Sequence, residues 1–367
     1  MGLRPLPASP SLWRMRKLTT LSSGPVGEGA RQRPTMRDVA ALAGVSLKTV
    51  SRVINAEPAV STDVQGRVLR AIAQLDYRPN LAASNLRRSG GKTATLGLVL
   101  EDLANPYSAA IIRAVEDTAR PRGVTVVAGS VDEDPARERA LAEDFISRRV
   151  DGLVVVPAST DHSYLASERR SGLPVVFVDR PPRNLDADAV VAANRDGAQA
   201  GVAHLIAAGH RRIAFIGDLP SISTAADRYA GYVDALGRAG LDIDPALVRR
   251  GVRGVEAAAA TAIELLSIDR PPTAIFAAQN VLSIGAFTAL RRLGRRAGIA
   301  LVGFDDFPLA DLLDPGITVV AQDPLAMGRL AAEILFRRLD GDRAPSSHLV
   351  VATRLIERGS GEIRPPG

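Results

Sequence analysis

The chain has 367 residues, with 46 Lys and Arg against 40 Asp and Glu and no cysteine. It is too long for one small domain, and the absence of cysteine excludes disulfide bonds, thiolate metal sites and cysteine nucleophiles. Residues 1–92 hold 15 basic against 5 acidic residues, and residues 93–367 hold 31 against 35, so we expect only the amino-terminal part to face nucleic acid phosphates.

Residues 1–33 are rich in Pro, Ser, Gly and Arg, and Glu28 is their first acidic residue. We interpret them as a disordered basic leader; the alternatives are an organelle transit peptide and a start codon placed too far upstream. No segment contains the roughly 18 consecutive apolar residues of a transmembrane helix. We therefore expect a soluble, cytoplasmic protein.

Residues 34–79 carry the pattern of a helix-turn-helix domain. Two short helices with a tight turn are predicted within residues 35–55, because Gly44 accepts the positive φ that such a turn requires. Thr35 and Ser46 are predicted to cap these helices, because a hydroxyl accepts a hydrogen bond from a free amide of the first turn. The second helix is then the one expected to read DNA.

A third helix is predicted over residues 62–76, with Ser61 as its cap. Apolar residues at helical spacing are expected to close a three-helix core, and they are Val39, Leu42, Val50, Val53, Val64, Val68, Ile72 and Leu75. Residues 80–93 follow as a hinge and linker. Their short basic segment permits a helix, and we expect it to fold on contact with DNA.

From residue 94 to residue 361 the pattern changes to apolar strands that alternate with amphipathic helices. The predicted strands are 95–100, 124–128, 152–156, 174–178, 212–216, 273–278, 300–304 and 318–321. Strands that are apolar throughout and separated by helices indicate parallel α/β sheets, which bind ligands at the carboxyl ends of their strands. Eight strands suggest two sheets, hence two lobes with a cleft.

Several motifs resemble those of one known family. Residues 36–55 read Met-Arg-Asp-Val-Ala-x-x-Ala-Gly-Val-Ser-x-x-Thr-Val-Ser-Arg-Val-x-Asn and are followed by Tyr77-Arg-Pro-Asn80. This pattern resembles the signature and hinge junction of the LacI/GalR (lac-repressor-type) family of bacterial transcription regulators. Further blocks are similar in the same order, among them Asn105-Pro-Tyr107, Arg228-Tyr-Ala-Gly231 and Val302-Gly-Phe-Asp-Asp306.

The resemblance implies an N-terminal all-α helix-turn-helix domain followed by a periplasmic-binding-protein-like core. This α/β core would consist of two doubly wound parallel-sheet lobes, dimerise, and bind a small effector between the lobes. The N-lobe is expected to comprise about residues 94–191 and 323–345. The C-lobe is expected to comprise about residues 192–322 and 346–361.

The resemblance also assigns the DNA contacts by position. Base edges in the major groove would meet Leu47, Lys48, Ser51 and Arg52. Phosphates would meet Thr35, Arg37, Thr49 and Asn55. In the hinge, Leu86 would enter the minor groove as an apolar wedge, and the neighbouring contacts would be Asn80, Ala83 and Arg87. The alternatives are a solvated basic face for Arg52 and a dimer-core position for Leu86. Ser84 stands where the family commonly has arginine.

Eight polar residues are expected in the effector cleft, namely Asn105, Tyr107, Asp179, Arg228, Arg253, Gln279, Asp305 and Gln322. Most of them follow predicted strands at the edge where such folds bind small molecules. Arg228 matches a family arginine that holds the effector. The alternative for each is a solvated turn residue. The expected effector is a sugar, a sugar phosphate or an organic acid.

Two departures from the family pattern concern the charge of this cleft. Gln279-Asn280 replaces the common Asn-Asp and loses an acid, and Arg253 falls where many sugar-binding members carry a stacking aromatic residue. A cleft with more guanidinium and less carboxylate suits negatively charged ligands. We therefore hypothesise that the cleft is more cationic than the family norm and that the effector is an anion.

The sequence predicts no enzyme, no cofactor and no metal site. Ser89-Gly-Gly-Lys-Thr93 imitates the end of a phosphate loop, but Leu86 occupies the position of its first glycine.

The alternative function is a solute-binding protein, and the helix-turn-helix argues against it. We predict a homodimeric transcription regulator, interpreted as a repressor, that binds a pseudo-palindromic operator. No leucine heptad follows the core, so a dimer is the expected assembly.

Overall fold

The computed structural model describes residues 34–54, 57, 60–78 and 92–366. The described residues divide into two compact units, one within residues 1–81 and one within residues 82–367. The predicted leader and most of the predicted hinge lie outside the described residues. Within the described part, no helix combines the length and the apolar character needed to cross a membrane.

The first unit contains three helices, α1 (Met36–Ala43), α2 (Leu47–Ile54) and α3 (Thr62–Gln74). Val39, Val50 and Val68 are fully buried between them, as their helical spacing predicts. Leu42 was expected in this core, but it is 46% exposed. The buried arc of α1 is formed by its residues 39, 40 and 43, and a residue at position 42 points away from that arc.

The predicted cap of α3 is also only partly correct. Ser61 occupies the position before the helix, yet its side chain makes no capping hydrogen bond. Its carbonyl oxygen instead accepts the amide of Gln65. The helix ends at Gln74, two residues earlier than predicted, and Tyr77 packs into the core just beyond it.

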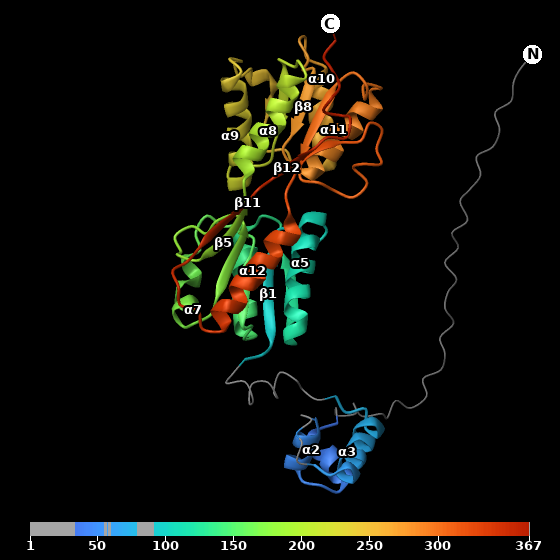
Figure 1. Cartoon of the computed structure of the whole chain (residues 1–367), viewed down its shortest axis with the longest axis vertical. Helices are drawn as coiled ribbons and strands as arrows, with labels where there is room; N and C mark the ends of the chain where they lie inside the picture. The colour runs from blue at the N-terminus through green and yellow to red at the C-terminus, as the bar shows by residue number, and fades with distance from the viewer. Residues whose placement is uncertain (1–33, 55–56, 58–59, 79–91, 367) are drawn as a thin grey trace, which may run out of the picture. The chain divides into compact units, whose positions relative to one another are not determined.

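The N-lobe of the second unit is built on a six-stranded parallel sheet (Figure 1). Its strands, in spatial order, are β11 (His348–Val351), β5 (Asp188–Ala192), β4 (Val175–Asp179), β3 (Gly152–Val155), β1 (Thr95–Leu100) and β2 (Thr125–Ser130). Two helices pack on one face, α5 (Pro106–Ala119) and α12 (Pro324–Leu339). The other face is covered by α6 (Pro135–Ser147). The short α7 (Ala166–Arg170) begins directly after Leu165, which is buried in the same core.

The C-lobe repeats this arrangement with a second six-stranded sheet. Its strands, in spatial order, are β12 (Arg354–Ile356), β10 (Thr318–Ala321), β9 (Ala300–Phe304), β8 (Ala274–Ala277), β6 (Ile213–Ile216) and β7 (Val248–Arg249). β12 is antiparallel to β10, and the other pairs are parallel. One face packs against α8 (Asn194–Ala207) and α9 (Ser223–Arg238), the other against α10 (Val255–Leu266) and α11 (Asn280–Arg292).

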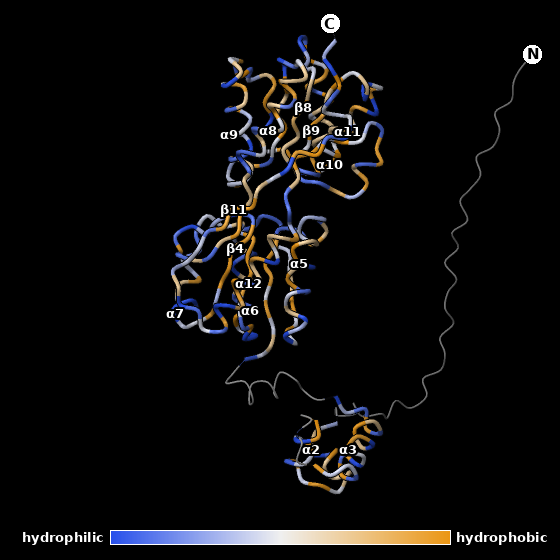
Figure 2. Tube along the Cα trace, in the orientation of Figure 1, coloured by the Kyte–Doolittle hydropathy of each residue, from blue (hydrophilic) through white to orange (hydrophobic). Residues whose placement is uncertain are grey.

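Each sheet therefore lies between two helical layers, which explains why its central strands are apolar on both faces. Figure 2 shows hydrophobic residues concentrated along these strands, for example in β4 and β8. The eight predicted strands are all present, with ends that differ by at most two residues. Four strands were missed, namely β5, β7, β11 and β12.

The chain passes between the lobes three times, after β5, after β10 and after β11. The last crossing was expected near residue 346, but β11 pairs with β5 of the N-lobe, so the crossing lies between Val351 and Arg354. The reason is that β11 is an edge strand with exposed side chains. Such a strand lacks the continuous apolar pattern of a buried one.

Candidate functional site

The turn between α1 and α2 has the geometry expected of a helix-turn-helix. Gly44 ends α1 with a left-handed φ of 63°, which glycine adopts without strain. Thr35 and Asp38 form a reciprocal capping box at the start of α1. Ser46 caps α2 through its hydroxyl, which accepts the amide of Thr49 at 3.1 Å. Both predicted caps are thus confirmed.

The solvent-facing side of α2 carries the residues predicted to read bases. Leu47 is 43% exposed and Lys48 is also exposed, while Val50 and Val53 hold the opposite side in the core. Ser51 is partly buried. The Arg52 guanidinium lies 3.5 Å from Glu57, and both side chains are more than 40% exposed. An exposed pair of this kind contributes little stability, so Arg52 can exchange it for another acceptor.

The residues predicted to meet phosphates lie at the starts of the two helices. Arg37 is exposed in the first turn of α1, and Thr49 shares a 2.9 Å hydroxyl hydrogen bond with Ser46. Helix N-termini favour anions, so these positions suit phosphate contacts. The remaining predicted DNA contacts lie outside the described residues, and they are Asn55, Asn80, Ala83, Leu86 and Arg87.

The predicted effector residues lie where the carboxyl ends of the two sheets face each other. Asp179 ends β4 and Asp305 follows β9, and these strands hold the same place in their sheets. Both aspartates adopt a left-handed φ, 72° and 67°, and both are only 6% exposed. A non-glycine residue is strained in this conformation, and such strain concentrates at functional sites.

Arg228 organises the C-lobe side of the cleft from inside α9. Its guanidinium donates to Asn194 at 2.8 Å and to Asp305 at 3.0 Å, and it lies 3.9 Å from the ring centre of Phe304. Burial raises the pKa of Asp305, and the positive charge of Arg228 opposes that rise. The pair is 7–8% exposed, so each charge depends on the other for stabilisation.

Hydrogen bonds continue from this pair to the N-lobe. Gln322 donates to Asp305 at 2.6 Å, and Tyr107 donates to Asp179 at 2.9 Å. Burial, more than the neighbouring carboxylates, raises the pKa of Tyr107, which keeps its hydroxyl protonated as a donor. Tyr107 and Gln322 also approach each other to 3.4 Å. Together these side chains join the two halves of the cleft.

The lobes are closed on each other. Asn280 of the C-lobe donates to Asn105 of the N-lobe at 2.9 Å. The cavity between the lobes, lined by Asn105 and Gln279 among others, has a volume of about 30 Å³, which is room for about one water molecule. Two wider openings flank it, of about 350 Å³ beside Tyr107 and of about 230 Å³ beside Arg180.

Four charged residues of the cleft were not among the predicted site residues, namely Glu101, Glu133, Arg180 and Asp218. Arg180 donates to Glu133 at 2.7 Å and lies 3.3 Å from Asp179. Arg180 was expected at this edge because it follows the predicted strand 174–178 beside Asp179, and Glu101 and Asp218 also follow strand ends closely, so the same rule could have selected them. Glu133 has a left-handed φ of 60° and enters from a loop, which no sequence pattern indicated.

Arg253 lies at the edge of the cleft with its side chain 41% exposed, 3.8 Å from Glu101 and 3.5 Å from Asp218. Acids outnumber arginines in the cleft, which does not favour the anionic effector that we hypothesised; that the cleft is more cationic than the family norm stays a prediction. Its arginines are Arg180, Arg228 and Arg253, and its carboxylates are Glu101, Glu133, Asp179, Asp218 and Asp305. Every arginine is already paired with an acid, and two of these acids come from strand ends that the family comparison did not consider.

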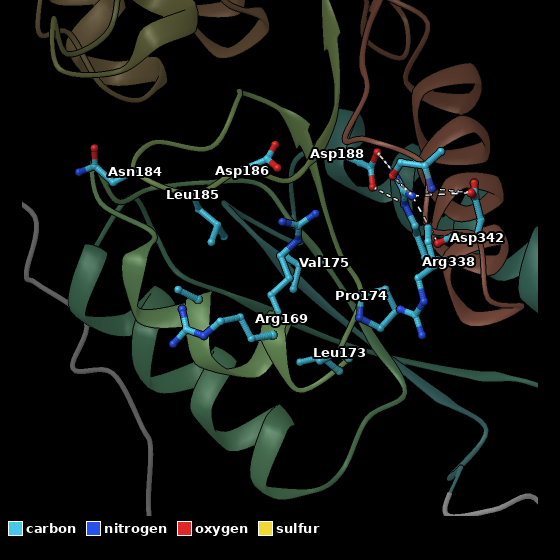
Figure 3. A pocket seen from close by; sticks show the side chains of 15 residues that line it. Arg169, Leu173, Pro174, Val175, Asn184, Leu185, Asp186, Asp188, Arg338 and Asp342 are labelled. Carbon is cyan, nitrogen blue, oxygen red and sulfur yellow. Dashed lines mark hydrogen bonds and ion pairs between the residues drawn. The ribbon is translucent and has the colours of Figure 1, made fainter.

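Another cavity, of about 500 Å³, lies at the opposite edge of the N-lobe sheet (Figure 3). Val175 and Asp188, which line it, begin β4 and β5, whereas ligands of such sheets bind at the carboxyl ends. Arg338 is held there by Asp188 through two contacts of 2.9 Å. This pair links α12 to the sheet, so we assign it a structural role.

Comparison with known proteins agrees with this architecture. Residues 35–80 match the model of bacterial regulatory proteins of the lacI family, and residues 202–361 match a periplasmic binding protein-like domain. The transcriptional repressor CytR of Escherichia coli K12 is 30% identical over 333 residues, which cover 90% of this chain and 97% of CytR. The chain belongs to the LacI family.

Two solved structures of LacI-family proteins extend the comparison. The Lac repressor dimer bound to operator and an anti-inducer is 28% identical, with a TM-score of 0.77 over 90% of this chain and 99% of that one. The regulator CelR in complex with cellobiose is 32% identical, with a TM-score of 0.66 over 89% of this chain and 100% of that one. This LacI-family chain is therefore a DNA-binding transcription regulator with an effector-binding core, not an enzyme.

Proposed function

We propose that this regulator is a homodimeric, cytoplasmic repressor whose affinity for a pseudo-palindromic operator is set by a small hydroxylated effector bound between the lobes. The observation that carries the proposal is the buried set of hydrogen bonds around Arg228, Asp305 and Tyr107. An effector that binds the closed and open lobes with different affinity shifts the equilibrium between them. By linkage it changes the affinity for DNA by the same factor by which DNA changes the affinity for the effector.

For the DNA-binding half, we propose that Leu47, Lys48, Ser51 and Arg52 meet base edges. The phosphate contacts would be Thr35, Arg37, Thr49 and Asn55, and the hinge contacts would be Asn80, Ala83, Leu86 and Arg87. A side chain that reads a base affects specificity, whereas a phosphate contact affects affinity for all sequences alike.

Arg52→Ala tests this division. We select bound duplexes from a random pool with the full chain, then compare the selected site with random DNA. The variant should lose about 10- to 100-fold of its preference for the selected site, which corresponds to about 1–3 kcal/mol for a good base contact. Arg70→Ala, which removes an exposed charge from α3, is the matched control and should keep the ratio. An equal loss on both DNAs would contradict base reading by Arg52.

For the effector-binding half, we propose that Asn105, Tyr107, Asp179, Arg228, Arg253, Gln279, Asp305 and Gln322 line the ligand site. Carboxylates accept hydrogen bonds from hydroxyl groups, and the Arg228 guanidinium donates to their oxygens. Among a sugar, a sugar phosphate and an organic acid, the surplus of carboxylates favours the sugar. Calorimetry with neutral and anionic sugars tests the proposal, and tighter binding of the anions would contradict it.

A dimer is supported by an exposed apolar loop after β9 as well as by the Lac repressor dimer. Leu309 and Leu312 in this loop are 64% and 74% exposed, and exposed apolar clusters mark protein interfaces. We propose that this loop contributes to the subunit contact. Sedimentation of Leu312→Glu should show a shift toward monomer, whereas Leu293→Glu, at an exposed leucine just beyond α11, should remain dimeric.

A further inference from the structure

Glu101 is a cleft carboxylate that lacks a hydrogen-bond donor. It follows β1 directly and lines the closed cavity, and its side chain is only 20% exposed. Among the described residues no side chain or amide donates a hydrogen bond to it. Its nearest cations are Arg180 at 3.9 Å and Arg253 at 3.8 Å, both beyond hydrogen-bond distance. A partly buried carboxylate without a donor from the protein is free to accept hydrogen bonds from a ligand that enters the cleft.

Arg180 and Arg253, the two arginines nearest to Glu101, interact more closely with other groups. Arg180 is held by Glu133 and by the carbonyl oxygen of Pro157, each at 2.7 Å. Arg253 is nearer to Asp218 than to Glu101, and it is partly exposed to water. Both guanidinium groups therefore lie closer to other acceptors than to Glu101, and each forms only a long ion pair with it.

The charged groups around Glu101 also include more acids than arginines. Four carboxylates face one another here, namely Glu101, Glu133, Asp179 and Asp218, and they share two guanidinium groups. Burial and the charge of Glu133 raise the pKa of Glu101 to about 7, and Arg180 only partly opposes them. The acids around Glu101, three from the N-lobe and Asp218 from the C-lobe, thus outnumber the guanidinium groups near them.

We infer that the effector carries a protonated amine and that Glu101, with Asp218 opposite, forms the subsite that binds it. This inference rests on the proposed effector site between the lobes. An ammonium group has three donors and no acceptor, so it can satisfy a carboxylate from each lobe at once. Its charge restores the balance that Arg253 leaves incomplete. The hydroxyl groups of the same ligand meet Asp179, Arg228 and Asp305, so the ligand class is an amino sugar or a similar amino polyol.

Other occupants of this subsite fit less well. The described residues contain no group of acids and histidines arranged to hold a metal ion. A neutral hydroxyl donates a single hydrogen bond and leaves the surplus charge in place. A phosphate or carboxylate would add a further negative charge to the four already present.

The test compares sugars that differ at one substituent, using calorimetry and thermal unfolding of the full chain at pH 7. The panel is glucose, 2-amino-2-deoxyglucose, 6-amino-6-deoxyglucose and glucuronate, with the corresponding galactose series. An amino member should bind about tenfold more tightly than its neutral parent, as a charge-assisted hydrogen bond predicts, and the uronates should bind weakest. Glu101→Gln should reduce the ratio of amine to parent affinity to about one.

A matched control is Glu143→Gln, which neutralises a carboxylate that is 57% exposed on α6 and should keep the ratio. Asp218→Asn, in the C-lobe, is a second test variant and should also lower the ratio of amine to parent affinity. Preference for a neutral sugar or a uronate, or an amine preference that persists in Glu101→Gln, would overturn the amine subsite, while sugar binding itself would still support the proposed function. If no member of the panel bound, both the amine subsite and the hydroxylated effector would be contradicted.

Discussion

The two lobes share one strand order but differ in how their cleft charges are satisfied. In the C-lobe, Asp305 is paired with Arg228 at 3.0 Å inside a set of buried hydrogen bonds. In the N-lobe, Glu101 and Asp179 share Arg180 with Glu133. The two lobes have the same architecture, yet the charges of the C-lobe pair balance, whereas the N-lobe side of the cleft has more acids than arginines. This difference supports the proposal that the C-lobe positions the effector and that the N-lobe discriminates its charge.

Arg228→Met should have the largest effect, because it removes the cation on which the C-lobe half depends. Breaking a buried ion pair on one side costs about 3–5 kcal/mol of unfolding free energy, and urea denaturation at pH 7 measures it. Arg113→Met, which breaks an exposed pair with Asp117 on α5, should cost less than about 1 kcal/mol. Equal losses in the two variants would remove the distinction between the buried and exposed pairs.

Glu101→Gln should act in the opposite direction, with a pH dependence. The pKa of Glu101 is raised from 4.5 to about 7 in the folded chain, so the unfolded state loses its proton first as pH rises. Stability is therefore lost between about pH 4.5 and pH 7 and stays low above that range. The variant should gain about 1–3 kcal/mol at pH 8 and almost none at pH 4.5. A pH-independent gain would show that the charge of Glu101 is not the cause.

Asp218 is the C-lobe residue that corresponds to Glu101, and its substitution tests the difference between the two lobes. Burial also raises the pKa of Asp218, but an amide hydrogen bond from Leu219 and the charge of Arg253 oppose the rise. Asp218→Asn should therefore show the same sign of pH dependence with a smaller gain than Glu101→Gln. Denaturation curves at several pH values measure both variants, and a larger gain for Asp218→Asn would reverse the proposed asymmetry.

Tyr107→Phe should have a smaller effect on stability and a specific one on ligand binding. It removes the hydroxyl that donates to Asp179 at 2.9 Å, at a cost of about 1 kcal/mol. Tyr232→Phe in the C-lobe removes a hydroxyl that donates to the carbonyl oxygen of Ile213 at 2.9 Å and should cost a similar amount. Calorimetry should show weaker sugar binding for Tyr107→Phe alone; the same loss in both variants would indicate a general packing effect.

Arg253→Gln should change stability least, because its side chain is 41% exposed and its ion pairs are long. Such a pair contributes less than about 1 kcal/mol. The variant should still increase the preference for amino sugars, since it removes the cation that competes for Glu101 and Asp218. Thermal unfolding and the same sugar panel measure the two effects, and a reduced amine preference would contradict this role.

Much of the fold could be predicted because its signals are local. The buried strands of both sheets are short apolar runs, and each predicted strand is present. Three of the four missed strands, β7, β11 and β12, lie at sheet edges, whereas β5 lies between β11 and β4 and begins with the charged residue Asp188. β7 has two residues, and β11 exposes Leu349 and Val350 to solvent. An edge strand needs no apolar pattern, because only one of its sides pairs with a neighbour.

The structure brings several of the predicted effector residues together, and their role in binding stays a prediction. Asp179, Asp305, Tyr107 and Gln322 meet in the cleft, because the carboxyl ends of parallel strands gather at one edge of each sheet. The comparison with family motifs drew attention to Arg253 and to the lost acid at Asn280. It overlooked Glu101 and Glu133, which lie at positions that no quoted motif contains.

The sequence by itself determined the helix-turn-helix, the alternation of strands and helices, and the edge of each sheet at which polar side chains collect. These features follow from the spacing of residues that are near each other in the chain. Only the tertiary structure decided which charges face one another. Glu101, Arg180 and Asp218 come from separate strand ends, and the energy of their interaction depends on distances and burial that arise when the lobes close. The sign of the charge in the cleft is therefore a property of the closed fold.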